Sequence, residues 1–177
     1  MKRIQQVSLS LFLLLCLLLS ACGAVPGGTQ TSFSLEDVPA FSGEPYVVLQ
    51  DNQPGFSQED FTTDSFETYS SLDLLGRCGT AYASVGLDTM PTQDRESISS
   101  VKPSGWQTAQ YDTSLVDGGY LYNRCHLIGF QLTGENANEE NLITGTRYLN
   151  VEGMLPFENM VADYIKETGN HVLYRVT

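Results

Sequence analysis

The segment from residue 122 to residue 158 holds the side chains that could do chemistry. His126 has an ordinary pKa of about 6.5, so its neutral imidazole can accept a proton from water at working pH. Arg124 stands two residues earlier, and its forked guanidinium suits the oxygens of a phosphate. Asn150 offers a neutral oxygen to a hard cation, and Glu158 follows it along the chain. Metal-assisted hydrolysis of a phosphate ester uses these residue types.

The elements that would position these side chains are indicated by the hydrophobic pattern. After Pro156, apolar residues recur at helical spacing, and Gly169 stops the pattern, so we expect a helix between them. Residues 171–177 alternate like a strand. Four further segments are expected to be strands because they are β-prone or end in a turn: 46–49, 80–85, 106–111 and 120–122.

Two segments before residue 80 have helical features. Ser57, followed by Asp60, is typical of the capped start of a short helical turn. Apolar residues between Phe66 and Leu75 recur at near-helical spacing, which favours a second helix there. Several short strands separated by Gly, Pro and Asp clusters, together with these helices, predict a domain of the α+β class.

Separate blocks of the sequence resemble the DNA/RNA non-specific endonuclease family, the ββα-metal or His-Me finger nucleases. Residues 123–126 read Asn-Arg-Cys-His, which is similar to the Asp-Arg-Gly-His motif of that family. The similarity covers about residues 43–177 and includes the blocks 76–79 and 101–106 in the same order. It is greatest to the branch that contains the streptococcal DNases and the DNA-entry nucleases.

The resemblance implies both a fold and an activity. The implied fold is an antiparallel sheet with a two-stranded ribbon that carries the histidine and a following helix that carries the asparagine. The implied activity is sequence-nonspecific, metal-dependent cleavage of DNA, with RNA as an alternative substrate. Relatives in this branch continue for several strands past the position of Thr177, so we expect a domain shortened at its C-terminus.

The resemblance also implies a role for each site residue. His126 is the general base, oriented through its other ring nitrogen by a backbone carbonyl, and Arg124 and Glu158 complete the catalytic group. Asn150 holds Mg²⁺ or Mn²⁺, and a single neutral ligand leaves the ion its full charge and most of its water. Three further residues are assigned to substrate binding or to support of the site: Arg77, Arg147 and Asn141.

Two cysteines lie inside the motif blocks. Cys78 and Cys125 each follow an arginine, and an exported location would permit a disulfide between them. Sequence separation does not decide whether two sulfurs approach, so a bridge and two free thiols are both open. A bridge would allow redox control of activity. Asn123 and Cys125 also depart from the Asp and Gly of the motif, which could alter the reactivity of the site.

The N-terminus is typical of an exported lipoprotein. Residues 1–21 combine two cations with an apolar stretch too short to span a membrane, which predicts a signal peptide. The sequence before Cys22 resembles the bacterial lipobox, so we expect lipidation there and anchoring to the outer face of the cytoplasmic membrane, at the bacterial cell surface. Residues 22–45 are then a Gly- and Pro-rich tether, and residues 46–177 form the nuclease domain.

The charge of the chain argues against a broad nucleic-acid interface. The net charge is −12, and removal of the leader would take two further cations away. A nuclease with this charge needs its few cations concentrated at the site. The rival hypothesis is a surface lipoprotein that keeps the same scaffold and binds DNA or another ligand without cutting it.

Overall fold

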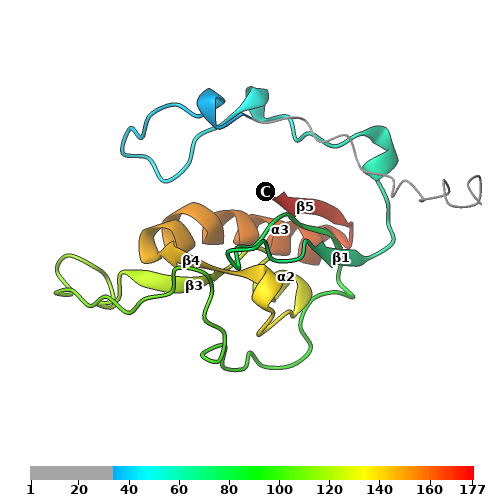
Figure 1. Cartoon of the computed structure of the whole chain (residues 1–177). Coiled ribbons are helices and arrows are strands. Elements are labelled where there is room, and N and C mark those ends of the chain that lie inside the picture. The colour runs from blue at the N-terminus through cyan, green and yellow to red at the C-terminus, as the bar shows by residue number, and fades with distance from the viewer. Residues whose placement is uncertain (1–33) are drawn as a thin grey trace, which may run out of the picture.

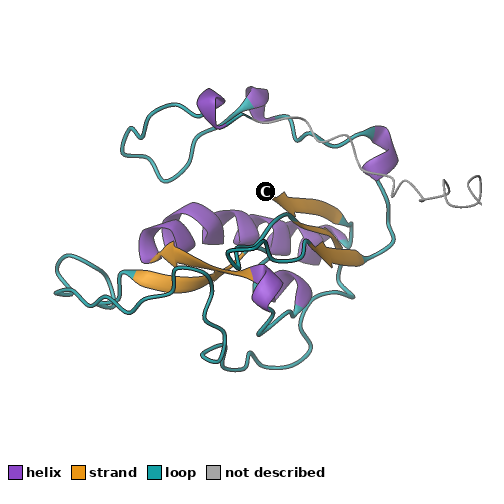
Figure 2. Ribbon diagram, viewed as in Figure 1, coloured by secondary structure: helices purple, strands orange, loops and turns teal. Residues whose placement is uncertain are grey.

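The computed structural model describes residues 34–177. The predicted signal peptide, residues 1–21, and the predicted lipidation site, Cys22, lie outside the described residues. Within residues 34–177, no helix is long and apolar enough to cross a membrane. The chain folds as an α+β domain with two antiparallel sheets and one long helix, which confirms the predicted class (Figures 1 and 2).

The larger sheet has three antiparallel strands in the order β1–β2–β5. These are β1 (Phe66–Tyr69), β2 (Ala81–Val85) and β5 (Val172–Val176). The central strand β2 confirms the strand predicted at 80–85, and β5 confirms the alternation seen at the end of the sequence. β5 comes from the far end of the chain, so the sheet joins segments that are widely separated in sequence.

The smaller sheet is a two-stranded ribbon. β3 (Tyr122–His126) pairs antiparallel with β4 (Leu142–Thr146), and His126 lies opposite Leu142. The chain between the strands forms the short helix α2 (Phe130–Thr133) and a 3₁₀ turn. The ribbon therefore presents the histidine at the end of a strand, where the backbone leaves the sheet.

The long helix follows the ribbon directly. After β4 the chain forms a π-helical segment, η5 (Leu149–Met154), which continues into α3 (Leu155–Thr168). Pro156 lies in the first turn of α3, and Gly169 ends it with a left-handed φ of 70°, as the sequence predicts. Figure 1 shows α3 lying along the molecule, with the β3–β4 ribbon toward its N-terminal end.

The hydrophobic core lies where α3 crosses the larger sheet. β2 contributes small side chains, Ala81 and Ala83, which allow close approach of the α3 residues Ala162 and Ile165. Burial of a side chain such as Ile165 stabilises the fold by about 1.5–3 kcal/mol. Residues just after β3, Leu127 and Ile128, belong to the same cluster. The end of the ribbon that carries His126 is therefore attached to the core by the two residues that follow the histidine.

Three of the elements predicted before β3 are wrong. The helix expected between Phe66 and Leu75 is strand β1 followed by a turn, because the backbone of residues 66–69 pairs with β2. Leu74 is fully exposed, so the apolar spacing does not mark a buried helical face. Residues 46–49, expected as a strand, have no strand partner, and residues 106–111 form only the isolated bridge between Gln110 and Tyr120.

The described part of the chain before β1 lies over α3 and the sheet. It contains three 3₁₀ turns: η1 (Leu35–Asp37), η2 (Gln50–Asn52) and η3 (Gln58–Asp60). η3 carries the predicted capping box between Ser57 and Asp60. The Tyr46 ring meets the Phe157 ring of α3 edge-on, with centroids 4.9 Å apart. The boundary predicted between tether and domain at residue 46 stays a prediction.

Candidate active site

His126 lies at the end of β3 with only 6% of its surface exposed. Its Nε2 lies 2.8 Å from the backbone carbonyl oxygen of Asn136. A carbonyl oxygen only accepts, so in the neutral ring Nε2 carries the proton and donates it to Asn136. Nδ1 is left with a lone pair, and it faces the guanidinium of Arg95, whose Nη2 is 3.4 Å away. The geometry therefore presents Nδ1 as a proton acceptor.

The surroundings of His126 also favour its neutral form. Burial is the main cause that lowers the pKa of the imidazole below its ordinary value, and the positive charge of Arg95 lowers it further. The hydrogen bond to the Asn136 carbonyl acts in the opposite direction. The net lowering means that His126 stays unprotonated, and able to accept a proton, at a lower pH than an ordinary histidine.

Asn141 holds the backbone that follows His126. Its Nδ2 donates to the carbonyl oxygen of Ile128 at 3.0 Å, and its Oδ1 accepts from the Ile128 amide at 2.9 Å. The Leu127 amide donates to the backbone oxygen of Asn141 at 2.9 Å. Asn141 is 0% exposed, and these hydrogen bonds let it position the turn after the histidine. Its assignment to substrate binding stays a prediction.

Glu158 lies in the first turn of α3 and packs against Gly129. A Cβ atom at position 129 would collide with the Glu158 carboxylate, so any other residue there would have to displace the end of that side chain. Burial raises the pKa of Glu158, while the hydrogen bond with Gln131 and the charge of Arg95 lower it. The charge of Arg95 thus acts on both His126 and Glu158.

Arg95 is a site residue that the sequence reasoning missed. It lies in an irregular loop between β2 and β3, with acidic neighbours on both sides, Asp94 and Glu96. No motif or periodic pattern marks this loop, and Arg95 is more than thirty positions before Glu158 and His126 in the order of the chain. Only the fold reveals the contact.

Replacement of Arg95 by glutamine should shift the pH dependence of activity. Because the Arg95 charge lowers the pKa of His126, its removal raises that pKa. A general base works in its deprotonated form, so activity should then be lost at a higher pH as the solution is acidified. The measurement is the acidic limb of kcat/KM against pH. Lys166→Gln removes an exposed charge from the last turn of α3 and should leave the limb in place; an unmoved limb in R95Q would contradict the assignment.

Asn150 lies in η5, half-buried, one turn before α3 begins. Residues 34–177 contain no group of three or more His, Cys, Asp or Glu side chains that could hold a metal ion. A neutral amide oxygen suits a cation that keeps most of its water, which is the coordination that Mg²⁺ prefers. The donor set therefore fits a hydrated divalent cation held by few protein atoms.

Arg124 turns away from Arg95 and toward the loop that precedes β3. Its Nε donates to the carbonyl oxygen of Val101 at 2.5 Å, and one terminal nitrogen donates to that of Ser99 at 3.2 Å. Its guanidinium lies over the Trp106 ring, 3.8 Å from the centroid. These contacts fasten the loop to β3. A catalytic contact of Arg124 with phosphate stays a prediction.

The other two predicted substrate-binding arginines are ion-paired with aspartates. Arg77 pairs with Asp73 through its Nε at 2.7 Å, within an exposed turn. Arg147 pairs with Asp117 through its Nε and one terminal nitrogen. Neither contacts His126 or Glu158 in the described structure. Their role in substrate binding stays a prediction.

Both cysteines are free thiols, so the bridge that the sequence left open does not form. Cys125 is buried on β3 and packs against Gly145 of β4, and burial raises the pKa of its thiol to about 11. The Cys78 sulfur lies 3.3 Å from the carbonyl oxygen of Leu142. Each sulfur faces backbone and not the other sulfur. The redox control that a bridge would allow therefore has no structural basis here.

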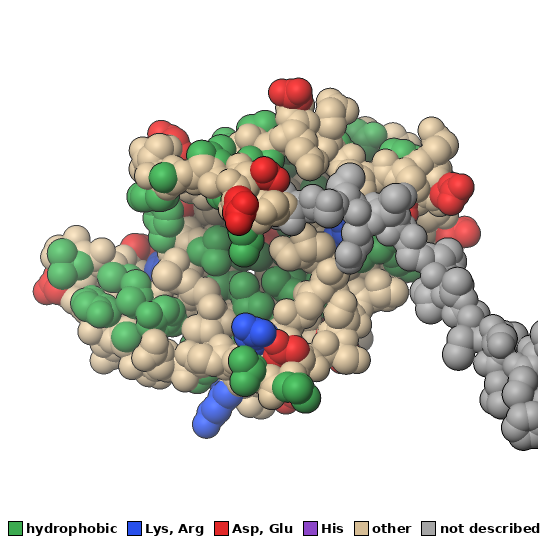
Figure 3. All heavy atoms as spheres, turned by 45° about the horizontal axis from the view of Figure 1, so that its top comes forward, with side chains coloured by type: hydrophobic (Ala, Val, Ile, Leu, Met, Phe, Trp, Pro, Cys, Tyr) green, Lys and Arg blue, Asp and Glu red, His purple; other side chains and the backbone are tan. Residues whose placement is uncertain are grey.

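The face of the molecule seen in Figure 3 shows no broad basic patch that would compensate the net charge. On the face seen in Figure 3, Lys and Arg side chains are few, whereas Asp and Glu side chains are scattered over it. Arg95 is thus the cation that the described contacts place beside the imidazole.

A β-ribbon that ends in a histidine and leads into a helix bearing an amide and a carboxylate is the ββα architecture of hydrolytic nucleases. The sequence pattern of the DNA/RNA non-specific endonuclease family matches residues 57–177. The chain belongs to this family. No curated protein sequence matches it significantly.

Solved structures share the fold. NucA from Streptococcus agalactiae with a magnesium ion bound superposes with a TM-score of 0.54 at 24% identity, over 67% of this chain and 58% of NucA. The metal-free form of NucA gives a TM-score of 0.53 at 24% identity, over 67% and 57% of the two chains. The Sda1 nuclease with bound zinc has a TM-score of 0.49 at 30% identity, over 62% and 60%. The match thus spans less than two thirds of NucA.

Proposed function

We propose that the chain is a metal-dependent, sequence-nonspecific endonuclease that hydrolyses phosphodiester bonds of DNA, with RNA as a second substrate. The observation that carries this proposal is the state of His126. Its Nε2 is tied to the Asn136 carbonyl, which leaves Nδ1 as the accepting nitrogen, and Nδ1 accepts a long hydrogen bond from Arg95 at 3.4 Å. Family membership supports the same reaction class.

The residues of the site divide the reaction between them. Nδ1 of His126 takes a proton from the attacking water, and the resulting hydroxide oxygen forms the new bond to phosphorus as the bond to the leaving oxygen breaks. Arg95 donates hydrogen bonds to a nonbridging phosphate oxygen, whose negative charge grows in the transition state. The Glu158 carboxylate supplies a negative charge that attracts the Arg95 guanidinium and helps to keep it in place.

Asn150 is the residue that would hold a divalent cation. The bound ion would supply Lewis-acid stabilisation of the phosphate and leaving oxygen. The single amide oxygen of Asn150 would leave most coordination positions of the ion open to water and phosphate. That NucA was solved with magnesium supports Mg²⁺ as the ion, with Mn²⁺ as an alternative of similar ligand preference.

The direct test is cleavage of plasmid DNA by the purified full chain. With Mg²⁺ the plasmid should be nicked and then degraded, and a chelator in excess should stop cleavage completely. Readdition of Mg²⁺ or Mn²⁺ should restore it. Cleavage at full rate in the presence of the chelator would remove the metal from the mechanism.

The rival function is a surface protein that binds DNA or another ligand on this scaffold without cutting it. The net charge of −12 favours the form of this rival that binds a ligand other than DNA, because a negatively charged protein repels a polyanion. The plasmid assay separates the two functions. Any Mg²⁺-dependent cleavage by the chain itself excludes a purely binding role.

A further inference from the structure

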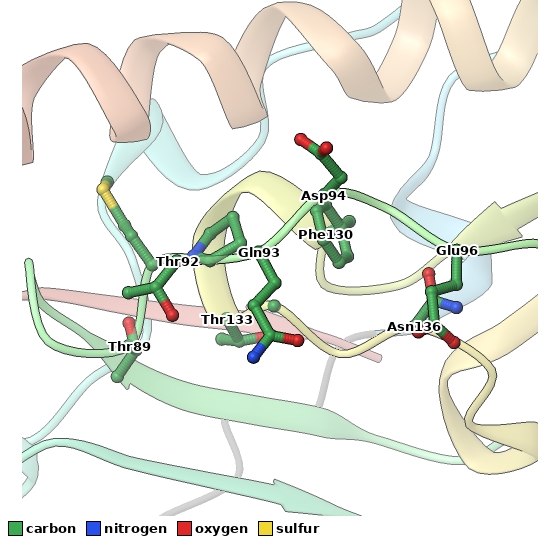
Figure 4. A pocket seen from close by; sticks show the side chains of 11 residues that line it. Thr89, Thr92, Gln93, Asp94, Glu96, Phe130, Thr133 and Asn136 are labelled. Carbon is green, nitrogen blue, oxygen red and sulfur yellow. The ribbon is translucent and has the colours of Figure 1, made fainter.

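A pocket of about 280 Å³ opens between the loop after β2 and helix α2. Its volume is close to the lower limit for small-ligand pockets. One wall is formed by residues 89–94 and Glu96, and the other by α2 with the residues that follow it. Figure 4 shows Glu96 and Asn136 at one end of the pocket, and Thr89 and Thr92 at the other.

Two residues of the pocket lining, Asn136 and Glu96, connect the pocket to the candidate active site. Asn136 lines the pocket with its side chain, while its backbone carbonyl accepts the hydrogen bond from His126. Glu96 lines the pocket next to Arg95, whose guanidinium faces the reactive Nδ1. A group bound here would therefore lie beside residues that adjoin His126 and Arg95, the two side chains that would act on the scissile phosphate.

The lining of the pocket selects against phosphate. Asp94 and Glu96 both line it, and no Lys or Arg is among the described residues that do. A phosphate group would be repelled by these carboxylates, whereas an N–H donor would be attracted. Asn136 adds a third acceptor group to the lining, and its Oδ1 has no hydrogen-bond partner among the described residues. An unpaired acceptor is stabilised when a small movement of its side chain lets a ligand supply a donor.

The lining also suits a flat ring. Phe130 contributes an aromatic face to the pocket wall. Aromatic side chains stack on nucleobases whatever the base. A planar group with N–H donors on its edge matches both the aromatic wall and the acceptors at the end of the pocket.

We propose that this pocket binds a nucleobase next to the scissile phosphate and prefers bases with an exocyclic amino group on their pairing edge. The proposal rests on the proposed nuclease function and adds to it a base preference at one position. Cytosine presents such an amino group to a carboxylate or amide oxygen, whereas thymine presents a carbonyl oxygen at the same place. Cytosine and thymine have rings of similar size, so a comparison of the two bases tests the hydrogen bond from the exocyclic amino group.

Cleavage of a single-stranded oligonucleotide of random sequence, followed by sequencing of the fragment ends, tests the preference. Cytosine should exceed thymine by about two- to tenfold at one position beside the cut, the effect of one or two hydrogen bonds. Asn136→Ala and Glu96→Gln should each reduce this ratio toward one. Glu139→Gln removes the same charge from an exposed residue outside the pocket and should leave the ratio unchanged. Equal use of all four bases by the wild-type chain would overturn the proposal while leaving it a nuclease.

Binding supplies a readout that does not need turnover. The His126→Ala full chain is titrated with cytidine and with thymidine, which lack phosphate, and the side-chain amide signals of Asn136 are followed by NMR. Cytidine should shift these signals saturably and at lower concentration than thymidine, and Glu96→Gln in the same background should weaken the cytidine effect. Equal responses to the two nucleosides, or none, would dismiss the pocket as a base site, even if the plasmid assay failed.

Discussion

Replacement of His126 by alanine is expected to lower the rate of phosphodiester cleavage by about 10²- to 10⁴-fold, the usual contribution of a positioned general base. The physical reason is that His126 offers a lone pair at Nδ1 while its other nitrogen is fixed by the Asn136 carbonyl. The measurement is single-turnover cleavage of a labelled duplex at saturating Mg²⁺. The acidic limb of the pH profile should also disappear in the variant, because the group that titrates is gone.

The other histidine of the chain provides the matched control. His171 lies in the larger sheet region, where its Nε2 contacts the Ser65 hydroxyl at 3.0 Å, and it has no contact with His126. His171→Ala should therefore retain cleavage within a few-fold of the wild type. A comparable loss in both variants would mean that folding and not base catalysis is responsible, and full activity of His126→Ala would eliminate the imidazole from the mechanism.

Replacement of Asn141 by alanine should lower the free energy of unfolding by about 2–4 kcal/mol. Both atoms of its side-chain amide pair with the backbone of Ile128, and the residue is completely buried. Alanine would leave an N–H and a C=O of Ile128 without partners inside the protein. Urea unfolding should show a lower midpoint with an unchanged m-value, because the same surface is exposed on unfolding.

An exposed asparagine gives the reference for this stability experiment. Asn170 follows α3, and its side chain donates to the Tyr164 hydroxyl at 3.0 Å on the surface. Asn170→Ala should change stability by no more than about 0.5 kcal/mol. If Asn141→Ala were equally mild, the paired amide would not be what holds the turn after β3.

The elements that were predicted correctly are those whose signals lie within the element itself. α3 begins at Leu155 and ends before Gly169 because proline in the first turn and a left-handed glycine at the end act within the helix itself. β2 and β5 were predicted from β-prone composition and alternation. The capping box at Ser57 is equally local, since both partners lie in one turn.

Elements that depend on a distant partner were assigned incorrectly. Residues 66–69 have an apolar spacing that also fits a helix, and only pairing with β2 makes them a strand. Residues 46–49 are β-prone, but no strand is available beside them in the described structure. Strand formation needs a second backbone, and a single stretch of sequence does not reveal whether one is present.

The same distinction applies to the candidate site. The amino-acid sequence alone predicted the histidine, asparagine and glutamate of the motif, because their types and order match the resemblance to the family and suit the chemistry. Only tertiary structure decided that Arg95 faces the histidine, that Asn136 orients it, and that Asn141 is buried behind it. The reason is physical: hydrogen bonds and charge interactions act over a few ångströms in space, and the loops that bring these groups together carry no periodic or motif signal along the chain.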